Sequence, residues 1–192
     1  MTFGKVRLSA GFVLLWSLLY FFDDGGWLVI VAASALVHEL GHWAAMRAFG
    51  KRIKLLSFTL GGINMTMSHT PHISWKADLF ITLAGPLVSL LLAAGAYSYG
   101  AWRVAGVSMV LAAVNLLPAA ALDGGRALGI IASQIWGSNG ERTVNFGGTA
   151  LCLCVMIAVG AWVAVQSGGR NLTLLAMSVP LLTGVGKTPS QA

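Results

Sequence analysis

The chain alternates between long apolar runs and short polar or glycine-rich breaks. A membrane-spanning helix needs roughly 20 mostly apolar residues, and about six runs approach or reach that length. They lie at about Arg7–Phe22, Trp27–Phe49, Ala77–Tyr99, Val104–Leu122, Gly147–Val165 and Leu172–Val185. The pattern therefore predicts an all-α polytopic membrane protein with about six transmembrane helices.

The first apolar run has a second interpretation. Lys5 and Arg7 precede it, and basic residues also precede the apolar part of a secretory signal peptide. No A-x-A cleavage pattern follows, and the residues from Asp23 to Gly26 are typical of a loop that leads directly into the next helix. We therefore expect a spanning helix here.

Residues 51–72 break the helical pattern. Ile53–Leu60 and Ile63–Met67 read as two strands, joined through a pair of glycines that is typical of a turn. Open sheet edges are not tolerated in lipid, so we expect a short membrane-associated β-hairpin at the cytoplasmic membrane face. An interfacial loop without a role remains the alternative. Further along, Ala127–Trp136 is typical of a short amphipathic interfacial helix, and residues 186–192 form a polar tail.

Composition supports the membrane interpretation. The 192 residues are 57% hydrophobic and only 9% charged, with a mean hydropathy of +0.79, whereas soluble domains carry about 25% charged residues. These values argue against a soluble protein, a disordered chain and a nucleic-acid binder. Cys152 and Cys154 lie in one apolar run, which excludes a disulfide framework.

The net charge of +6 is mostly an orientation signal. With the N-terminus in the cytoplasm, the cytoplasmic segments hold Lys5, Arg7, Arg47, Lys51, Arg52, Lys54, Lys76, Arg126, Arg142 and Lys187. Only Arg103 and Arg170 then fall on the outer side. This positive-inside bias predicts cytoplasmic N- and C-termini.

The segment His38-Glu39-Leu40-Gly41-His42 is an H-E-x-x-H motif inside the second run. Residues i and i+4 lie one helical turn apart on the same face, so two imidazoles can bind one metal ion. Glu39 is adjacent to the first ligand position and is suited to accept a proton from the attacking water. Ionisable residues inside a spanning helix are expensive, and are therefore functional candidates by default.

A catalytic zinc ion needs three protein ligands, and the motif supplies two. The other candidates are His69, His72, Asp78 and Asp123, with Glu141 in a polar loop as a weaker one. Asp123 stands out because it ends the fourth run near the same leaflet. Pro118, Gly124 and Gly125 supply the means to break that helix, which would let Asp123 turn toward the two histidines.

Two motifs together resemble the site-2 protease family of intramembrane zinc metalloproteases. They are HELGH at residues 38–42 and NLLPAAALDGGR at residues 115–126. The resemblance covers residues 8–186 and is closest to the compact branch that includes the sporulation sigma-factor processing protease. It implies that His38, His42 and Asp123 bind one catalytic Zn²⁺ and that Glu39 is the general base.

The resemblance also implies that Asn115 contacts the substrate backbone or helps to stabilise the oxyanion. The segment 84–86 (Ala-Gly-Pro) matches a small-residue bend of the family, although simple close packing of helices fits equally well. The chain departs from the pattern before Asp123, where Ala121 and Leu122 stand in place of a frequent proline. We expect residues 1–192 to form a single intramembrane metalloprotease domain without a PDZ or CBS module.

The expected function is hydrolysis of peptide bonds in membrane-embedded or membrane-associated protein substrates. The expected location is a prokaryotic cytoplasmic membrane, with a regulatory membrane protein as a possible partner and no nucleic acid. Two alternatives stay open at this point. One is a zinc-binding membrane transporter, and the other is a catalytically inactive relative that binds substrate.

Overall fold

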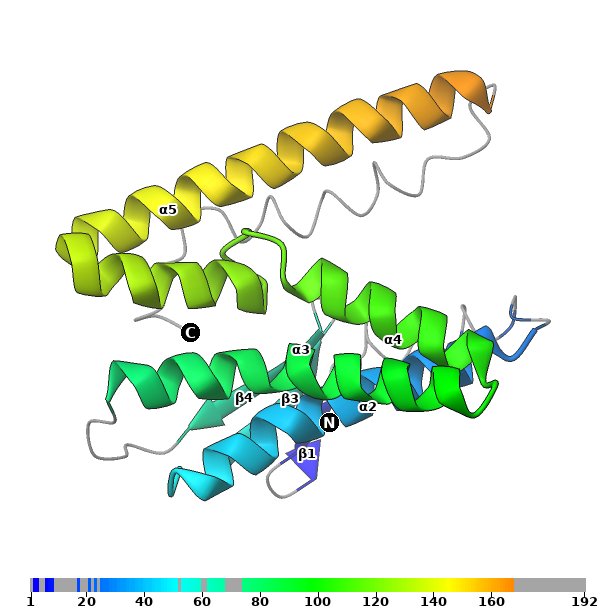
Figure 1. Cartoon of the computed structure of the whole chain (residues 1–192), viewed down its shortest axis with the longest axis horizontal. Helices are drawn as coiled ribbons and strands as arrows, with labels where there is room; N and C mark the ends of the chain where they lie inside the picture. Colours follow the sequence, from blue (N-terminus) through cyan, green and yellow to red (C-terminus); the bar gives the residue numbers. More distant parts are fainter. Residues whose placement is uncertain are drawn as a thin grey trace. The chain divides into compact units, whose positions relative to one another are not determined.

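The computed structural model describes residues 2–3, 6–8, 17, 21, 23, 25–51, 53–59, 62–67 and 74–167 (Figure 1). The chain forms two compact units, which comprise Met1–Ala113 and Val114–Ala192. Within the described part, three helices are long and apolar enough to cross a membrane: α2 (Trp27–Ala48), α3 (Trp75–Ser98) and α5 (Asp123–Gln166). The chain is accordingly a membrane protein.

The first unit is built around the packing of α2 on α3. Small residues allow the close approach, because a Cβ atom on Gly41 of α2 would lie 2.8 Å from the Ala84 carbonyl oxygen of α3. Ala45, Met46, Ile81 and Ala84 form a buried cluster beside this contact. A third helix, α4 (Trp102–Asn115), joins them through a buried hydrogen bond of 3.3 Å from the Ser108 hydroxyl to the Ser34 hydroxyl of α2. The helix pair thus holds the H-E-x-x-H segment at its centre.

Local signals set where the helices of the first unit begin. The Asp23 carboxylate accepts hydrogen bonds from the backbone N–H groups of Trp27 and Leu28, at 3.0 and 2.8 Å, in the first turn of α2. The Ser74 hydroxyl caps α3 by accepting from the Ala77 N–H group at 3.3 Å. Such side-chain acceptors satisfy N–H groups that the first helical turn leaves without partners.

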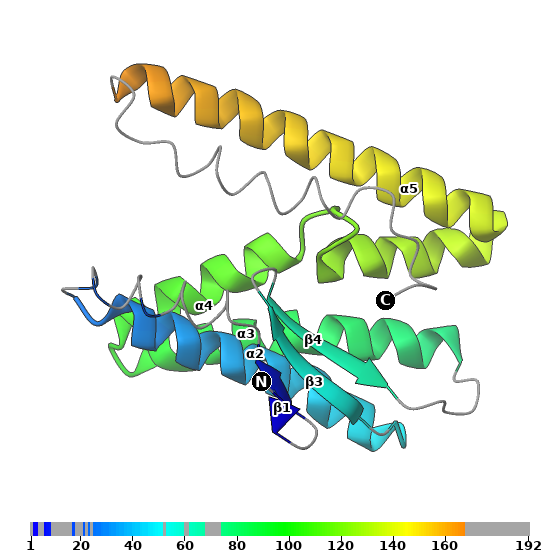
Figure 2. The same cartoon turned by 180° about the vertical axis from the view of Figure 1, so that it is seen from behind.

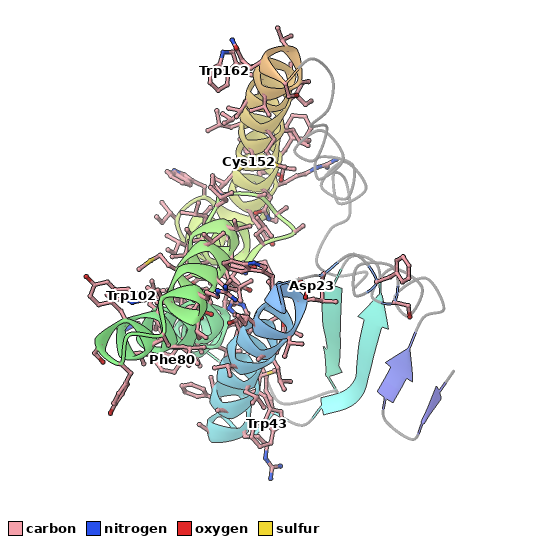
Figure 3. All side chains as sticks on the ribbon, turned by 90° about the vertical axis from the view of Figure 1, so that its right-hand side faces the viewer. Asp23, Trp43, Phe80, Trp102, Cys152 and Trp162 are labelled. Carbon is pink, nitrogen blue, oxygen red and sulfur yellow. The ribbon has the colours of Figure 1, made fainter. Side chains whose placement is uncertain are left out.

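A sheet of four strands lies on the α2 side of the first unit (Figures 2 and 3). Its strands are β1 (Thr2–Phe3), β2 (Val6–Leu8), β3 (Ile53–Thr59) and β4 (Gly62–Met67), in that spatial order. β3 and β4 are antiparallel, and β2 runs parallel to β3 with Val6 opposite Leu56. β4 is therefore an edge strand of this sheet.

The sheet corrects one part of the sequence prediction. Arg7 and Leu8, expected to begin the first spanning helix, belong to β2 and pair with Ser57 and Phe58. The rest of that predicted run lies outside the described residues, except for Ser17 and Phe21, which are helical. The predicted sixth run, Leu172–Val185, also lies outside them.

The second unit contains α5, which is interrupted at Gly137. Gly137 has a φ angle of 69°, a left-handed conformation that favours glycine, and the chain folds back there into two antiparallel arms (Figure 1). The first arm includes the predicted interfacial helix Ala127–Trp136, and the second includes the predicted run Gly147–Val165. Cys152 is buried on the second arm and Cys154 is exposed, so the two thiols do not share a face.

The fourth predicted run is shorter than expected. α4 ends at Asn115, and the residues from Leu116 to Leu122 are not helical. Proline disfavours a helical conformation for the residue before it, and Pro118 follows the helix end by three residues. Asp123 is consequently the first residue of α5 rather than the last part of the preceding helix.

Candidate metal centre

The two histidines of the motif face each other on α2. The Nε2 atoms of His38 and His42 lie 3.3 Å apart, and the rings meet edge to face at an interplanar angle of 78°. Two nitrogen ligands at the usual Zn–N distance on a tetrahedral ion would be separated by about 3.3 Å. The spacing of these atoms therefore fits two ligands of one zinc ion.

The opposite nitrogen of each ring is held by α3. His42 Nδ1 lies 2.8 Å from the main-chain oxygen of Ile81, and His38 Nδ1 lies 2.9 Å from the Ser89 hydroxyl. Metal-binding histidines commonly use the second nitrogen in this way, since such a bond fixes the ring orientation. The sequence alone does not reveal Ser89 or Ile81 as partners of the histidines, because they lie 51 and 39 residues away from them in the chain.

Gly85 on α3 leaves the space that the His42 ring occupies. A Cβ atom at this position would overlap the imidazole, including its Nε2 atom. The sequence left two readings of the segment 84–86, a family bend and close helix packing. The structure supports the second and adds that the close approach is to the histidine itself.

The remaining candidates of the first unit have other positions. Glu39 lies between the two histidines in the chain and is half-buried. Asp78 forms an ion pair with Lys51, with 2.9 Å between the carboxylate oxygen and Nζ. This pair joins the end of α2 to the start of α3, which gives Asp78 a structural role. His69 and His72 lie outside the described residues.

Exposed aromatic residues mark both ends of the helix pair. Trp27 begins α2, and Tyr97 near the end of α3 contacts Trp102, whereas Trp43 and Trp75 lie near the opposite ends of these two helices. Tryptophan and tyrosine gather at both interfaces of a membrane. At the usual helical rise, His38 lies about 16 Å from Trp27 and about 8 Å from Trp43 along α2. The histidine pair thus lies between the two aromatic ends of α2, nearer the end that carries Trp43.

The second unit carries the other two predicted site residues. Asn115 is the last residue of α4 and is half-buried, and Asp123 is the first residue of α5 and is 8% exposed. The segment between them packs against its own unit, since the Thr149 hydroxyl accepts a hydrogen bond of 2.9 Å from the Ala120 N–H group. The same hydroxyl donates to the main-chain oxygen of Asn145 at 2.7 Å.

Gly124 and Gly125 act differently from what the sequence suggested. The sequence predicts that they break a helix, whereas both lie in the first turn of α5. A Cβ atom on Gly124 would overlap the carbonyl group of Leu116, and one on Gly125 would overlap that of Ala119. The two glycines thus allow the start of α5 to lie directly on the preceding segment, which fixes where Asp123 begins the helix.

The fold and the paired imidazoles define a membrane protein with an H-E-x-x-H centre. No protein-family model matches the chain. It is 31% identical over 166 residues to the putative zinc metalloprotease Rip3 of Mycobacterium tuberculosis, covering 75% of this chain and 40% of that protein. It is 29% identical over 150 residues to the stage IV sporulation protein FB of Bacillus subtilis, covering 71% and 49%. The chain thus spans less than half the length of either relative.

A solved structure shares the fold. The site-2 protease from Methanocaldococcus jannaschii matches with a TM-score of 0.69 and 20% identity, over 96% of this chain and 91% of that one. The sequence relatives and the solved structure support the resemblance to the site-2 protease family that the two motifs indicate.

Proposed function

We propose that the chain is an intramembrane zinc metalloprotease that hydrolyses peptide bonds of membrane-embedded or membrane-associated proteins. The observation that carries this proposal is the 3.3 Å separation of the His38 and His42 Nε2 atoms on an apolar helix, beside a glutamate. The naming of Rip3 as a putative zinc metalloprotease supports zinc as the ion.

His38 and His42 would hold the zinc ion, with Asp123 as the third ligand. A carboxylate suits zinc, and three protein ligands leave a position open for the reaction. Asp123 supports this role in two ways, because it is buried and because it stands at the N-terminus of α5, where the helix dipole favours a negative charge. Its place on a packed segment restricts its motion, as a ligand requires.

Zinc, when bound, supplies a Lewis acid that polarises the scissile carbonyl and lowers the pKa of water. Glu39 would take the proton of the attacking water and deliver it to the leaving amine. Asn115 would hold the substrate backbone or the developing negative oxygen through its side-chain amide. The half-buried position of Glu39 and Asn115 is consistent with groups that must reach substrate.

A helical substrate hides its carbonyl groups in intrahelical hydrogen bonds, so it must unwind before attack. An extended substrate segment would add to the edge of β4 by main-chain hydrogen bonds, since β3 already pairs with β2 on its other side. Successive N–H groups of a strand point to opposite edges, and proline has no N–H group. One of the two variants Asn64→Pro and Met65→Pro therefore removes an N–H group from the outer edge of β4. Cleavage that is unchanged in both variants would rule out this role.

The proposed setting is a prokaryotic cytoplasmic membrane with both termini in the cytoplasm, following the distribution of basic residues. The partners are then the lipid bilayer, a membrane protein substrate and, where access is controlled, a regulatory membrane protein. Residues 1–192 would act as one metalloprotease domain. Insertion of reporter groups at either terminus tests the orientation, and a reporter that is active only on the outer side would contradict it.

The test of the function is Glu39→Gln in the full chain, co-expressed with a membrane-protein substrate. Zinc content should stay at the wild-type level while cleavage stops, because the variant keeps the ligands and loses the base. Unchanged cleavage would contradict the assignment. Zinc flux into vesicles that survives the substitution, together with a wild-type protein that cleaves nothing, would identify a transporter instead.

A further inference from the structure

The two imidazoles are held by chemically different partners. The partner of His42 Nδ1 is the main-chain oxygen of Ile81, which can only accept, so the ring donates from Nδ1 and presents Nε2 as a ligand. The partner of His38 Nδ1 is the Ser89 hydroxyl, which can donate or accept. The state of His38 therefore depends on a side chain, whereas that of His42 depends on the backbone.

The contact between His38 and Ser89 is closed to solvent. Ser89 is 0% exposed and His38 is 4% exposed, so bulk water does not reach the hydroxyl to replace it. Ser89 lies on α3, the helix that also supplies the Ile81 oxygen and the gap at Gly85. One helix thus positions both rings, and Ser89 does so through a side-chain hydroxyl.

We propose that Ser89 is a positioning residue that sets the zinc affinity of the centre by orienting His38. This inference rests on the proposed function. When Nε2 of His38 binds the ion, its proton resides on Nδ1 and the Ser89 oxygen accepts it in a hydrogen bond. Ile81 acts through its main chain, whereas Ser89 acts through its side chain, so a substitution at Ser89 removes the hydrogen bond to His38 directly.

The chain offers a matched control on α4. Ser108 is also 0% exposed, and its hydroxyl donates a hydrogen bond of 3.3 Å to the Ser34 hydroxyl. Ser89→Ala and Ser108→Ala remove the same atom from equally buried sites of one unit. A general loss of packing or of buried hydrogen bonding would affect both variants alike.

The experiment measures the zinc dissociation constant of the purified full chain by competition with a chelator. The visible spectrum of the cobalt(II)-loaded protein is recorded as a second readout. We expect Ser89→Ala to weaken zinc binding by about 10- to 100-fold, the range for loss of such a ligand-orienting bond, and to change the cobalt bands. Ser108→Ala should keep the wild-type constant and spectrum. Ser89→Thr, which restores a hydroxyl, should recover most of the lost affinity.

Several results would overturn the inference. A zinc constant and a cobalt spectrum of Ser89→Ala equal to those of Ser108→Ala would show that the hydroxyl does not position the ligand. An equal loss of zinc affinity in Ser89→Thr and Ser89→Ala would also show that the hydroxyl does not position the ligand. A wild-type chain that binds no zinc would refute the proposed function and this inference with it, whereas normal wild-type binding with an unaffected Ser89→Ala would refute the inference alone.

Discussion

The histidine-bearing helix pair of the first unit and the aspartate-bearing segment of the second are ordered by different means. The His38 ring is oriented by a hydrogen bond with the Ser89 hydroxyl, and the His42 ring by a hydrogen bond that it donates to the Ile81 oxygen, both on the neighbouring helix. The start of α5 at Asp123 is defined by close backbone packing at Gly124 and Gly125. Side-chain hydrogen bonds thus set ring orientation in one region, while the absence of side chains sets the chain path in the other.

The helices α2 and α5 also begin differently. α2 begins with hydrogen bonds from the Trp27 and Leu28 N–H groups to the Asp23 carboxylate. α5 follows Leu122, whose side chain makes no capping hydrogen bond. The first helix is therefore sensitive to the charge of one capping side chain, and the second to the volume of residues in its first turn.

The largest effect on stability is expected for Gly124→Ala. The added methyl group would overlap the Leu116 carbonyl, and backbone of a packed segment cannot move aside cheaply. We expect a loss of about 3 kcal/mol in the free energy of unfolding, the upper end of overpacking costs. Gly147→Ala, on the same helix with open space around its Cβ position, is the control. Equal thermal unfolding of the two variants would contradict the packing role of Gly124.

The next effect is expected for Gly85→Ala in the first unit. Its methyl group would displace the His42 ring from its bond with Ile81, so stability should fall by about 1–3 kcal/mol. Zinc binding should fall as well, because the displaced ring is the proposed ligand. Gly95→Ala on the same helix has no neighbour within 4 Å and should be neutral or slightly stabilising. Normal zinc binding by a folded Gly85→Ala variant would refute the account of this position.

The smallest effect is expected at Asp23. The hydrogen bond from the Leu28 N–H group, with those from Trp27 and Gly25, lowers the pKa of the Asp23 carboxyl from its ordinary value of 3.8. A lowered pKa contributes stability that is present above the unfolded value and is lost as the pH falls through the folded value. The free energy of unfolding should therefore fall less between about pH 5 and pH 3 in Asp23→Asn than in the wild type. Identical pH profiles of thermal unfolding in the wild type and the variant would exclude the carboxylate as a source of this stability.

Local signals in the sequence predict several helices and the pairing of the two histidines. The motif at residues 38–42 predicted a shared helical face because its spacing matches one helical turn, and the structure brings the two Nε2 atoms together. Four of the predicted runs overlap α2, α3, α4 and α5. Each of these predictions needs only residues that are neighbours in the chain.

The parts that sequence reasoning missed depend on distant pairings. β2 pairs with β3 across about 50 residues, so Arg7 and Leu8 read as the start of an apolar helix. Ser89 resembles any serine of an apolar run until α3 is packed on α2. Gly124 and Gly125 were interpreted as helix breakers because their local propensity says so, whereas their contacts are with carbonyl groups earlier in the chain.

The central proposal is that His38, His42 and Asp123 bind one zinc ion. The direct measurement is the zinc content per chain of the purified wild type, a His38→Ala/His42→Ala variant and Asp123→Ala, with Asp78→Ala as the acidic control. The account predicts about one zinc in the wild type and the control, almost none without the histidines, and a clear loss without Asp123. Zinc content that is the same in all four proteins would contradict it.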